Sequence, residues 1–189
     1  MILSISGASG AGKSSLAKEL LALLPSASLS PGWSTRAVRP SETAADVRHV
    51  SPDLFEEMRT RGDFLWALEV HGNWYGILRQ TVADGLTSEH SWTLLALTPD
   101  VLLTLRDFAE KNERRQSLKL LYVLSPEREV LRARLAERET SPEVIERRLA
   151  DCVKWDEAAV SSGLYDLIIP GYGDLMANAH SVLADLTRG

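Results

Sequence analysis

Residues 7–14 read Gly-Ala-Ser-Gly-Ala-Gly-Lys-Ser, a glycine-rich run between a short apolar stretch and a periodic one. Residues 2–5 have the apolar pattern of a buried strand, and residues 13–24 carry leucines at helical spacing before Pro25. The run is a complete match to G-x-x-x-x-G-K-[S/T], in the strand–loop–helix setting that this pattern requires. It therefore predicts a phosphate-binding loop and places the chain among the α/β folds built around such loops.

The residue types in this loop explain the chemistry that it predicts. Glycines let the backbone bend until successive N–H groups point at phosphate oxygens, and the following helix presents its positive N-terminus to the same anion. Lys13 would reach the β and γ phosphates, and the Ser14 hydroxyl would ligate Mg²⁺. The expected ligands are thus ATP and Mg²⁺, bound by Gly7, Ala8, Ser9, Gly10, Ala11, Gly12, Lys13, Ser14 and Ser15.

Composition restricts the remaining function classes. The chain has 189 residues, which favours a single domain, and a formal net charge of −5, which argues against general binding to nucleic acid or to an anionic membrane. Cys152 is the only cysteine, so no intrachain disulfide can form, and we predict a buried thiol on a helix. The first residues lack the pattern of a secretion signal, and no apolar run reaches the ~20 residues that span a bilayer. We expect a cytoplasmic protein.

Apolar periodicity predicts the elements that follow the loop. Ser51 followed by proline is typical of a helix N-terminus, with the helix continuing to about residue 61. Residues 64–74 are predicted as short antiparallel strands that turn at Gly72-Asn73. Further buried strands are expected over residues 92–97, 118–124 and 166–169, and helices over residues 126–138 and 142–159. Alternating strands and helices predict an α/β fold, the three-layer αβα arrangement of P-loop NTPases with a mainly parallel central sheet.

Two later segments carry polar groups that suit a second phosphate. Arg36 and Arg39 lie three residues apart in a turn-rich stretch, where two guanidinium groups can bind one phosphate. Residues 69–76 read Glu-Val-His-Gly-Asn-Trp-Tyr-Gly. Each feature alone is also compatible with a solvated surface arginine, an exposed strand carboxylate or a half-buried aromatic ring.

Together these segments resemble the guanylate kinase family. Its members carry a phosphate loop, then S-T-T-R-x-P-R-P-G-E, then F-x-S-x-x-x-F, then E-V-H-G-N-x-Y-G. This chain has STRAVRPSE, HVSPDLF and GDFLWALEVHGNWYG in the same order, and residues 131–138, 144–149 and 165–169 resemble the family's lid, its following helix and its last strand. The resemblance implies one domain over residues 1–189, with a core (1–31, 78–125 and 160–189), an acceptor-binding insertion (32–77) and a helical lid (126–159).

The resemblance also implies roles for individual residues. The acceptor phosphate would be held by Arg36 and Arg39 with the Tyr75 hydroxyl beside them, and Glu69 would accept hydrogen bonds from a guanine edge. Ser34 belongs to the same expected acceptor site. The lid arginines Arg134, Arg138 and Arg148 would act with Lys13 on the moving phosphoryl group, in an in-line transfer that depends on positioning and cations.

The chain departs from the family pattern in the acceptor site. Gly32 and Ile77 stand where the family usually has a serine and a serine or threonine near the base, and Val47 stands in place of a second phosphate-binding tyrosine. The family's D-I-D carboxylates are missing from residues 94–100, unless Asp100 replaces one of them from a shifted position. Residues 170–174 replace an N-D-D-like segment, which bears on the adenine pocket.

These departures leave three functions open. The first is phosphorylation of GMP or dGMP by ATP, which Glu69 and the residues around it favour. The second is phosphorylation of ribose 1,5-bisphosphate, because phosphokinases for that acceptor resemble guanylate kinases but lack the base-recognition residues. The third is a kinase-like binding module without turnover, against which the intact loop and the lid arginines argue.

Overall fold

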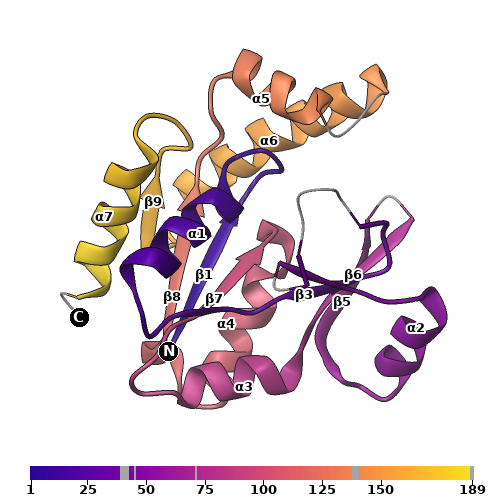
Figure 1. Cartoon of the computed structure of the whole chain (residues 1–189), viewed down its shortest axis with the longest axis vertical. Helices are drawn as coiled ribbons and strands as arrows, with labels where there is room; N and C mark the ends of the chain where they lie inside the picture. Colours follow the sequence, from indigo (N-terminus) through magenta and orange to yellow (C-terminus); the bar gives the residue numbers. More distant parts are fainter. Residues whose placement is uncertain (39–42, 45, 71, 138–140, 188–189) are drawn as a thin grey trace. The chain divides into compact units, whose positions relative to one another are not determined.

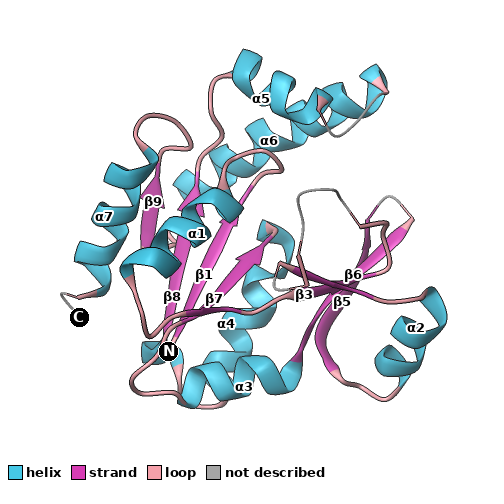
Figure 2. Cartoon of the chain, in the orientation of Figure 1, coloured by secondary structure: helices cyan, strands magenta, loops and turns pink. Residues whose placement is uncertain are grey.

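The computed structural model describes residues 1–38, 43–44, 46–70, 72–137 and 141–187, and these residues divide into two compact units. The first unit comprises Met1–Leu3, Ser26–Leu95 and Val101–Leu118. The second comprises Ser4–Pro25, Ala96–Asp100 and Lys119–Gly189. Figures 1 and 2 show the elements of both units along the chain.

A five-stranded sheet has the order β2-β7-β1-β8-β9, with non-consecutive neighbours that are typical of crossover connections. Its strands are β1 (Ile2–Gly7), β2 (Ser28–Leu29), β7 (Thr93–Leu97), β8 (Leu118–Val123) and β9 (Leu167–Ile169). The β2–β7 pair and the β8–β9 pair are both parallel, and Leu121 lies opposite Leu167 in the latter. Strand β1 is buried along its whole length: Ile2, Leu3 and Ile5 supply its apolar side chains, and the small side chains of Ser4 and Ser6 are buried between them.

The second unit contains the helices that follow β1, β8 and β9. These are α1 (Lys13–Leu23), α5 (Arg128–Ala136), α6 (Pro142–Ser162) and α7 (Leu175–Leu186). Helix α6 begins at Ser141, whose hydroxyl accepts from the Val144 N–H, and ends at Gly163 in the left-handed conformation. Helix α7 begins at Asp174, whose carboxylate accepts from the Met176 N–H.

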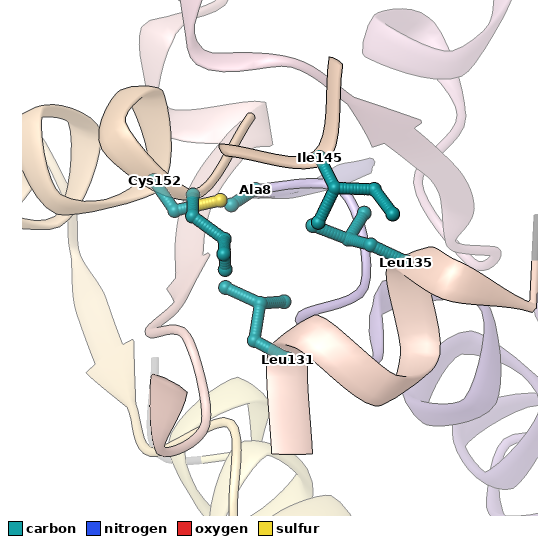
Figure 3. Close-up of a cluster of buried hydrophobic side chains, with 6 residues drawn as sticks. Ala8, Leu131, Leu135, Ile145 and Cys152 are labelled. Atoms are coloured by element: carbon teal, nitrogen blue, oxygen red, sulfur yellow. The ribbon is translucent and has the colours of Figure 1, made fainter. Parts of the chain in front are cut away.

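Helices α5 and α6 pack together around a buried apolar cluster that includes the phosphate loop (Figure 3). Leu131 and Leu135 of α5 meet Ile145 and Leu149 of α6, with Ala8 and Cys152 completing the cluster and Trp155 packing against it. Burying one leucine side chain contributes about 1.5–3 kcal/mol. The two helices predicted as the lid are therefore fixed by apolar contacts, and one of those contacts is with the loop itself.

The first unit contains a four-stranded sheet of order β4-β3-β6-β5. Its strands are β3 (Gly32–Ser34), β4 (Val47–His49), β5 (Phe64–Val70) and β6 (Asn73–Leu78), and its helices are α2 (Pro52–Thr60), α3 (Arg79–Thr87) and α4 (Leu102–Lys111). One face of the sheet packs on α2 through Phe55, Met58 and Phe64, with Trp33 and Trp74 beside them. The α2 helix begins as the sequence predicts, with the Ser51 hydroxyl accepting from the Leu54 N–H.

The α/β fold with a mainly parallel sheet is confirmed, and the predicted elements occur within a few residues of their expected bounds. The antiparallel pair β5–β6 turns at Gly72, whose φ of 74° requires glycine-like freedom. One difference is β3, which forms within the stretch predicted as turn-rich because it pairs with β4 and β6. Helices α3, α4 and α7 were not predicted from the sequence. No helix in the described part of the chain is long and apolar enough to cross a bilayer.

Candidate active site

The phosphate loop follows β1 and is shaped by three glycines with positive φ: Gly7 at 146°, Gly10 at 87° and Gly12 at 107°. A β-carbon at Gly7 would lie 2.5 Å from the Val123 carbonyl oxygen, so no larger residue fits without a shift of backbone. Gly12 is the N-cap of α1 and supplies no capping side chain. The N-terminus of a helix presents backbone N–H groups and a partial positive charge, which is the arrangement that binds phosphate.

Lys13 is held inside this loop. Its Nζ atom donates to the carbonyl oxygens of Gly7 and Ala8, both at 2.8 Å. The ammonium group therefore lies within the curve of the backbone, where the sequence predicts the β and γ phosphates. A bound triphosphate would offer this cation stronger, charged acceptors than two carbonyl groups.

Arg134 reaches the same loop from α5. Its Nη1 atom donates to the Gly10 carbonyl oxygen at 2.9 Å and lies 4.0 Å from the position that a β-carbon at Gly12 would take. This guanidinium is half-buried, whereas the neighbouring Arg132 is exposed and pairs with Glu146 of α6. Of the predicted lid arginines, Arg134 is thus joined to the phosphate loop, Arg148 lies half-buried on α6, and Arg138 lies outside the described residues.

Close packing behind the loop fixes its backbone. A β-carbon at Gly171, in the segment between β9 and α7, would lie 1.8 Å from the Leu124 carbonyl oxygen and 3.0 Å from that of Ala11. Asn178 of α7 holds the same segment by donating to the Pro170 carbonyl oxygen at 3.0 Å. In the sequence this segment stands out only as a departure from the family pattern, yet its Gly-x-Gly pattern after a strand is a recognisable sign of close backbone approach.

Buried titratable groups of the second unit keep their protons. Burial, together with the negative charge of Asp156, raises the pKa of the Cys152 thiol to about 11. Burial also raises the pKa of Tyr165 to about 12, with the Asp100 carboxylate adding to that rise. Cys152 is therefore a neutral, buried residue of α6, as the sequence predicts.

The residues predicted for the acceptor site lie in the first unit. The Arg36 backbone is held on both sides: its N–H donates to Ser34 Oγ at 3.2 Å, and His49 Nδ1 donates to its carbonyl oxygen at 2.9 Å. Thr35 Oγ1 accepts from the Trp74 N–H at 2.9 Å. Arg36 thus projects from a firmly bonded strand end, and its Nη1 atom donates to the Ala37 carbonyl oxygen. Arg39 lies outside the described residues.

Strand register separates the other predicted acceptor residues. Tyr75 lies opposite both Ser34 and Leu68, so these three side chains share one face of the sheet. Glu69 lies opposite Trp74, which packs on the other face against α2. Because successive side chains of a strand alternate between faces, the structure brings Tyr75 and Ser34 together and does not bring Glu69 to them. Trp66 and Ile77 are opposite each other on the face of Tyr75.

No group of three or more acidic, histidine or cysteine side chains is placed to hold a metal within the described ranges. A magnesium ion bound with a nucleotide needs few protein ligands, because phosphate oxygens and waters complete its shell. Ser14, the second residue of α1, is exposed at the loop, so its hydroxyl suits that single-ligand role. The loop therefore fits the group that the sequence predicts.

The loop, the N-terminus of α1 and the two cations beside it place the chain among the P-loop proteins. Comparison with solved structures agrees: a guanylate kinase from Anaplasma phagocytophilum has a TM-score of 0.73 at 23% identity, with 100% of this chain and 85% of that chain covered. A shikimate kinase from Acinetobacter baumannii has a TM-score of 0.55 at 17% identity, covering 99% and 93%. At these identities the likeness shows the fold.

Sequence comparison identifies the family. The guanylate kinase family model matches residues 1–185. A guanylate kinase of Thiobacillus denitrificans is 40% identical over 148 residues, or 77% of this chain and 68% of that protein, and one of Alkalilimnicola ehrlichii is 37% identical over 79% and 71%. The chain belongs to the guanylate kinase family and is a phosphotransferase of the nucleoside monophosphate kinase type.

Proposed function

We propose that this protein transfers the γ-phosphoryl group of ATP to the phosphate of a small acceptor, with GMP or dGMP as the first candidate. The observation that carries the proposal is the phosphate loop, in which Lys13 and Arg134 both contact loop carbonyl groups. The relatives that match over most of this chain bear the name guanylate kinase, which supports GMP as acceptor.

The proposed division of work follows from the contacts. Backbone N–H groups of residues 7–15 hold the phosphates of ATP, and Lys13 and Arg134 balance the charge on the oxygens of the moving group. The Ser14 hydroxyl would hold Mg²⁺, which would neutralise further phosphate charge. An oxygen of the acceptor phosphate attacks the γ-phosphorus, and ADP leaves from the opposite side. Arg148 and Arg138 remain proposed lid residues in this scheme.

For the acceptor we propose that Arg36, Ser34 and Tyr75 bind its phosphate, with Arg39 as a further predicted ligand. Arg36 lies two residues beyond β3 and Tyr75 lies on the neighbouring β6, and a hydrogen bond between Thr35 and Trp74 joins the two segments. Both side chains supply donors to an anion, and an arginine remains charged at every physiological pH. The sequence predicts Glu69 as the base reader, but its strand position lies on the face opposite Tyr75, so it is left out of the proposed acceptor site.

The position of Glu69 on the face opposite Tyr75 favours a second candidate acceptor, ribose 1,5-bisphosphate. Trp66, Leu68 and Ile77 surround the face of Tyr75 with apolar groups, and Gly32 adds no side chain there. Such a face offers few partners for the N1–H and exocyclic amine of guanine, and buried donors without partners cost about 1–3 kcal/mol each. An acceptor without a base has no such donors to bury, so its binding carries no free-energy penalty of this kind.

A coupled assay of ADP release separates these candidates. MgATP would be held at saturation while GMP, dGMP, AMP, CMP, UMP and ribose 1,5-bisphosphate are varied in turn. The proposal predicts that GMP or dGMP gives the highest kcat/KM. Turnover with ribose 1,5-bisphosphate alone would replace GMP by the second candidate. Binding of ATP without ADP release from any acceptor would leave a binding module and overturn the proposed activity.

A further inference from the structure

Asp156 of α6 binds two groups at the end of strand β8, and no step above uses it. Its Oδ1 atom accepts from the Tyr122 hydroxyl at 2.9 Å, and its Oδ2 atom accepts from the Ser125 N–H at 3.0 Å. Tyr122 is fully buried and makes an edge contact with Tyr165 at a centroid distance of 4.9 Å. Burial raises the pKa of Tyr122, so its hydroxyl remains a hydrogen-bond donor. The carboxylate is therefore held in one place by a rigid partner.

The backbone that Asp156 binds belongs to residues 124–127, the segment immediately before α5, which we call the root of α5. Helix α5 is the first of the two helices predicted as the lid. Leu124 N–H donates to the Ile169 carbonyl oxygen of β9 at 2.9 Å, and Ser125 N–H donates to Asp156. The next residue is Pro126, which has no N–H, and α5 begins at Arg128. The chain is thus fixed to the core through Ser125, and the link that turns into α5 starts immediately afterwards.

Arg134 of α5 contacts the phosphate loop, so a change in the orientation of α5 at its root displaces Arg134 at the loop. Arg134 lies six residues from the helix start, a distance of ~9 Å along the axis at 1.5 Å per residue. A tilt of about ten degrees at the root therefore moves this position by ~1.5 Å. Displacements of ~1 Å at reacting groups can lower a rate about 10²-fold.

Asp156 also joins the two lid helices to the same point. It lies on α6, and the N-terminal half of α6 supplies Ile145 and Leu149 to the apolar cluster that holds α5 against Ala8 (Figure 3). Cys152, one turn before Asp156, closes that cluster. The Asp156 carboxylate thus joins α6 to the end of β8, from which the chain continues into α5.

We propose that Asp156 is a positioning residue for phosphoryl transfer: through Tyr122 and the Ser125 N–H it fixes the root of α5 and so places Arg134 at the phosphate loop. The inference rests on the phosphotransferase activity and not on which acceptor is used. It requires the two hydrogen bonds rather than the negative charge, because Asp156 contacts neither the loop nor Arg134 in the described interactions.

This distinction makes the conservative variant informative. In Asp156→Asn, the amide oxygen can still accept from the Ser125 N–H, and the amide N–H can donate to the Tyr122 oxygen, so both contacts are kept although the second hydrogen bond is reversed in direction. Asp156→Ala loses both, and Tyr122→Phe loses one. Glu157→Ala is a matched control, because Glu157 is the next residue of α6 and is exposed.

Steady-state ADP release at saturating MgATP and GMP gives the first readout. We expect kcat to fall about 10–100-fold in Asp156→Ala, with the KM for ATP changed less than about threefold. Asp156→Asn and Glu157→Ala should stay within about threefold of the wild-type kcat, and Tyr122→Phe should lie between them and Asp156→Ala. Equal losses in Asp156→Asn and Asp156→Ala would overturn the proposal, as would an unchanged kcat in Asp156→Ala.

Amide hydrogen exchange with a non-hydrolysable MgATP analogue gives a second readout that needs no acceptor. In the wild type and Asp156→Asn, the analogue should slow exchange in both α1 and α5. In Asp156→Ala it should slow exchange in α1 alone; equal slowing of α5 would contradict the inference. If wild type shows no turnover with GMP, the proposed acceptor fails while this measurement still decides the role of Asp156. If Asp156→Ala does not fold, Tyr122→Phe decides it by the same comparison.

Discussion

The phosphate loop and the four-stranded sheet differ in how their predicted residues are positioned. In the loop, glycine conformation and backbone carbonyl groups fix the site, and the predicted residues Lys13 and Arg134 both contact it. In the sheet, the predicted acceptor residues are side chains at alternating strand positions, and register assigns Tyr75 and Glu69 to opposite faces. A motif whose function depends on backbone is thus more securely transferred between sequences than one whose function depends on side-chain direction.

The largest effect should come from Lys13→Ala, which removes the cation at the centre of the loop. We expect kcat to fall by at least ~10³-fold with any acceptor, because the Lys13 ammonium group is held within the loop where the phosphates of ATP are expected. ADP release measures this, with Lys18→Ala as control on the exposed side of the same helix. Unchanged activity in Lys13→Ala would show that the loop is not the donor site. The loop would then be no more reliably predicted than the four-stranded sheet.

A smaller but large effect is expected for Arg134→Ala. If Arg134 balances charge on the moving phosphoryl group as proposed, its loss should lower kcat about 10²-fold or more, with a smaller change in the KM for ATP. Arg132→Ala is the matched control, since Arg132 lies on the same helix and pairs with Glu146. Single-turnover assays of both variants would show whether the loop contact of Arg134 contributes to phosphoryl transfer. Equal, small losses in the two variants would mean that it does not.

The acceptor half is tested by comparing Tyr75→Phe with Glu69→Ala. Tyr75→Phe should lower kcat/KM for the acceptor about tenfold by removing one hydrogen bond to an anion. The strand register leads us to expect a change below about threefold for Glu69→Ala, equal for GMP and ribose 1,5-bisphosphate. A loss in Glu69→Ala that is confined to GMP would instead establish Glu69 as the base reader and show that the acceptor half is as transferable as the loop.

The smallest effect concerns stability at alkaline pH in the cluster behind the loop. Burial raises the pKa of Cys152 from 9.0 to about 11, so the unfolded chain loses this proton at a lower pH than the folded chain. The associated stability is present below about pH 9 and is lost as the pH rises towards about 11. Thermal unfolding should show a steeper fall of Tm over that interval in wild type than in Cys152→Ala. Parallel curves would refute the assignment.

The sequence predicts the loop and the strands and helices around it because glycine spacing, caps and apolar periodicity act locally. Ser51, Ser141 and Gly72 each occupy the position that their chemistry favours. Strand β3 was not predictable in this way, because it has three residues and exists only through pairing with β4 and β6. The role of Asp156 likewise depends on a partner 34 positions away in the chain, for which no local pattern exists.

The most direct test is a product analysis of one reaction mixture containing MgATP, GMP and ribose 1,5-bisphosphate, with wild type and Lys13→Ala in parallel. The wild type should form ADP and one phosphorylated acceptor in equal amounts, and Lys13→Ala should form neither. Which acceptor is consumed assigns the function of the four-stranded sheet. Equal product from Lys13→Ala, or no ADP from a wild-type protein that binds ATP, would contradict the assignment of the phosphate loop as a working donor site.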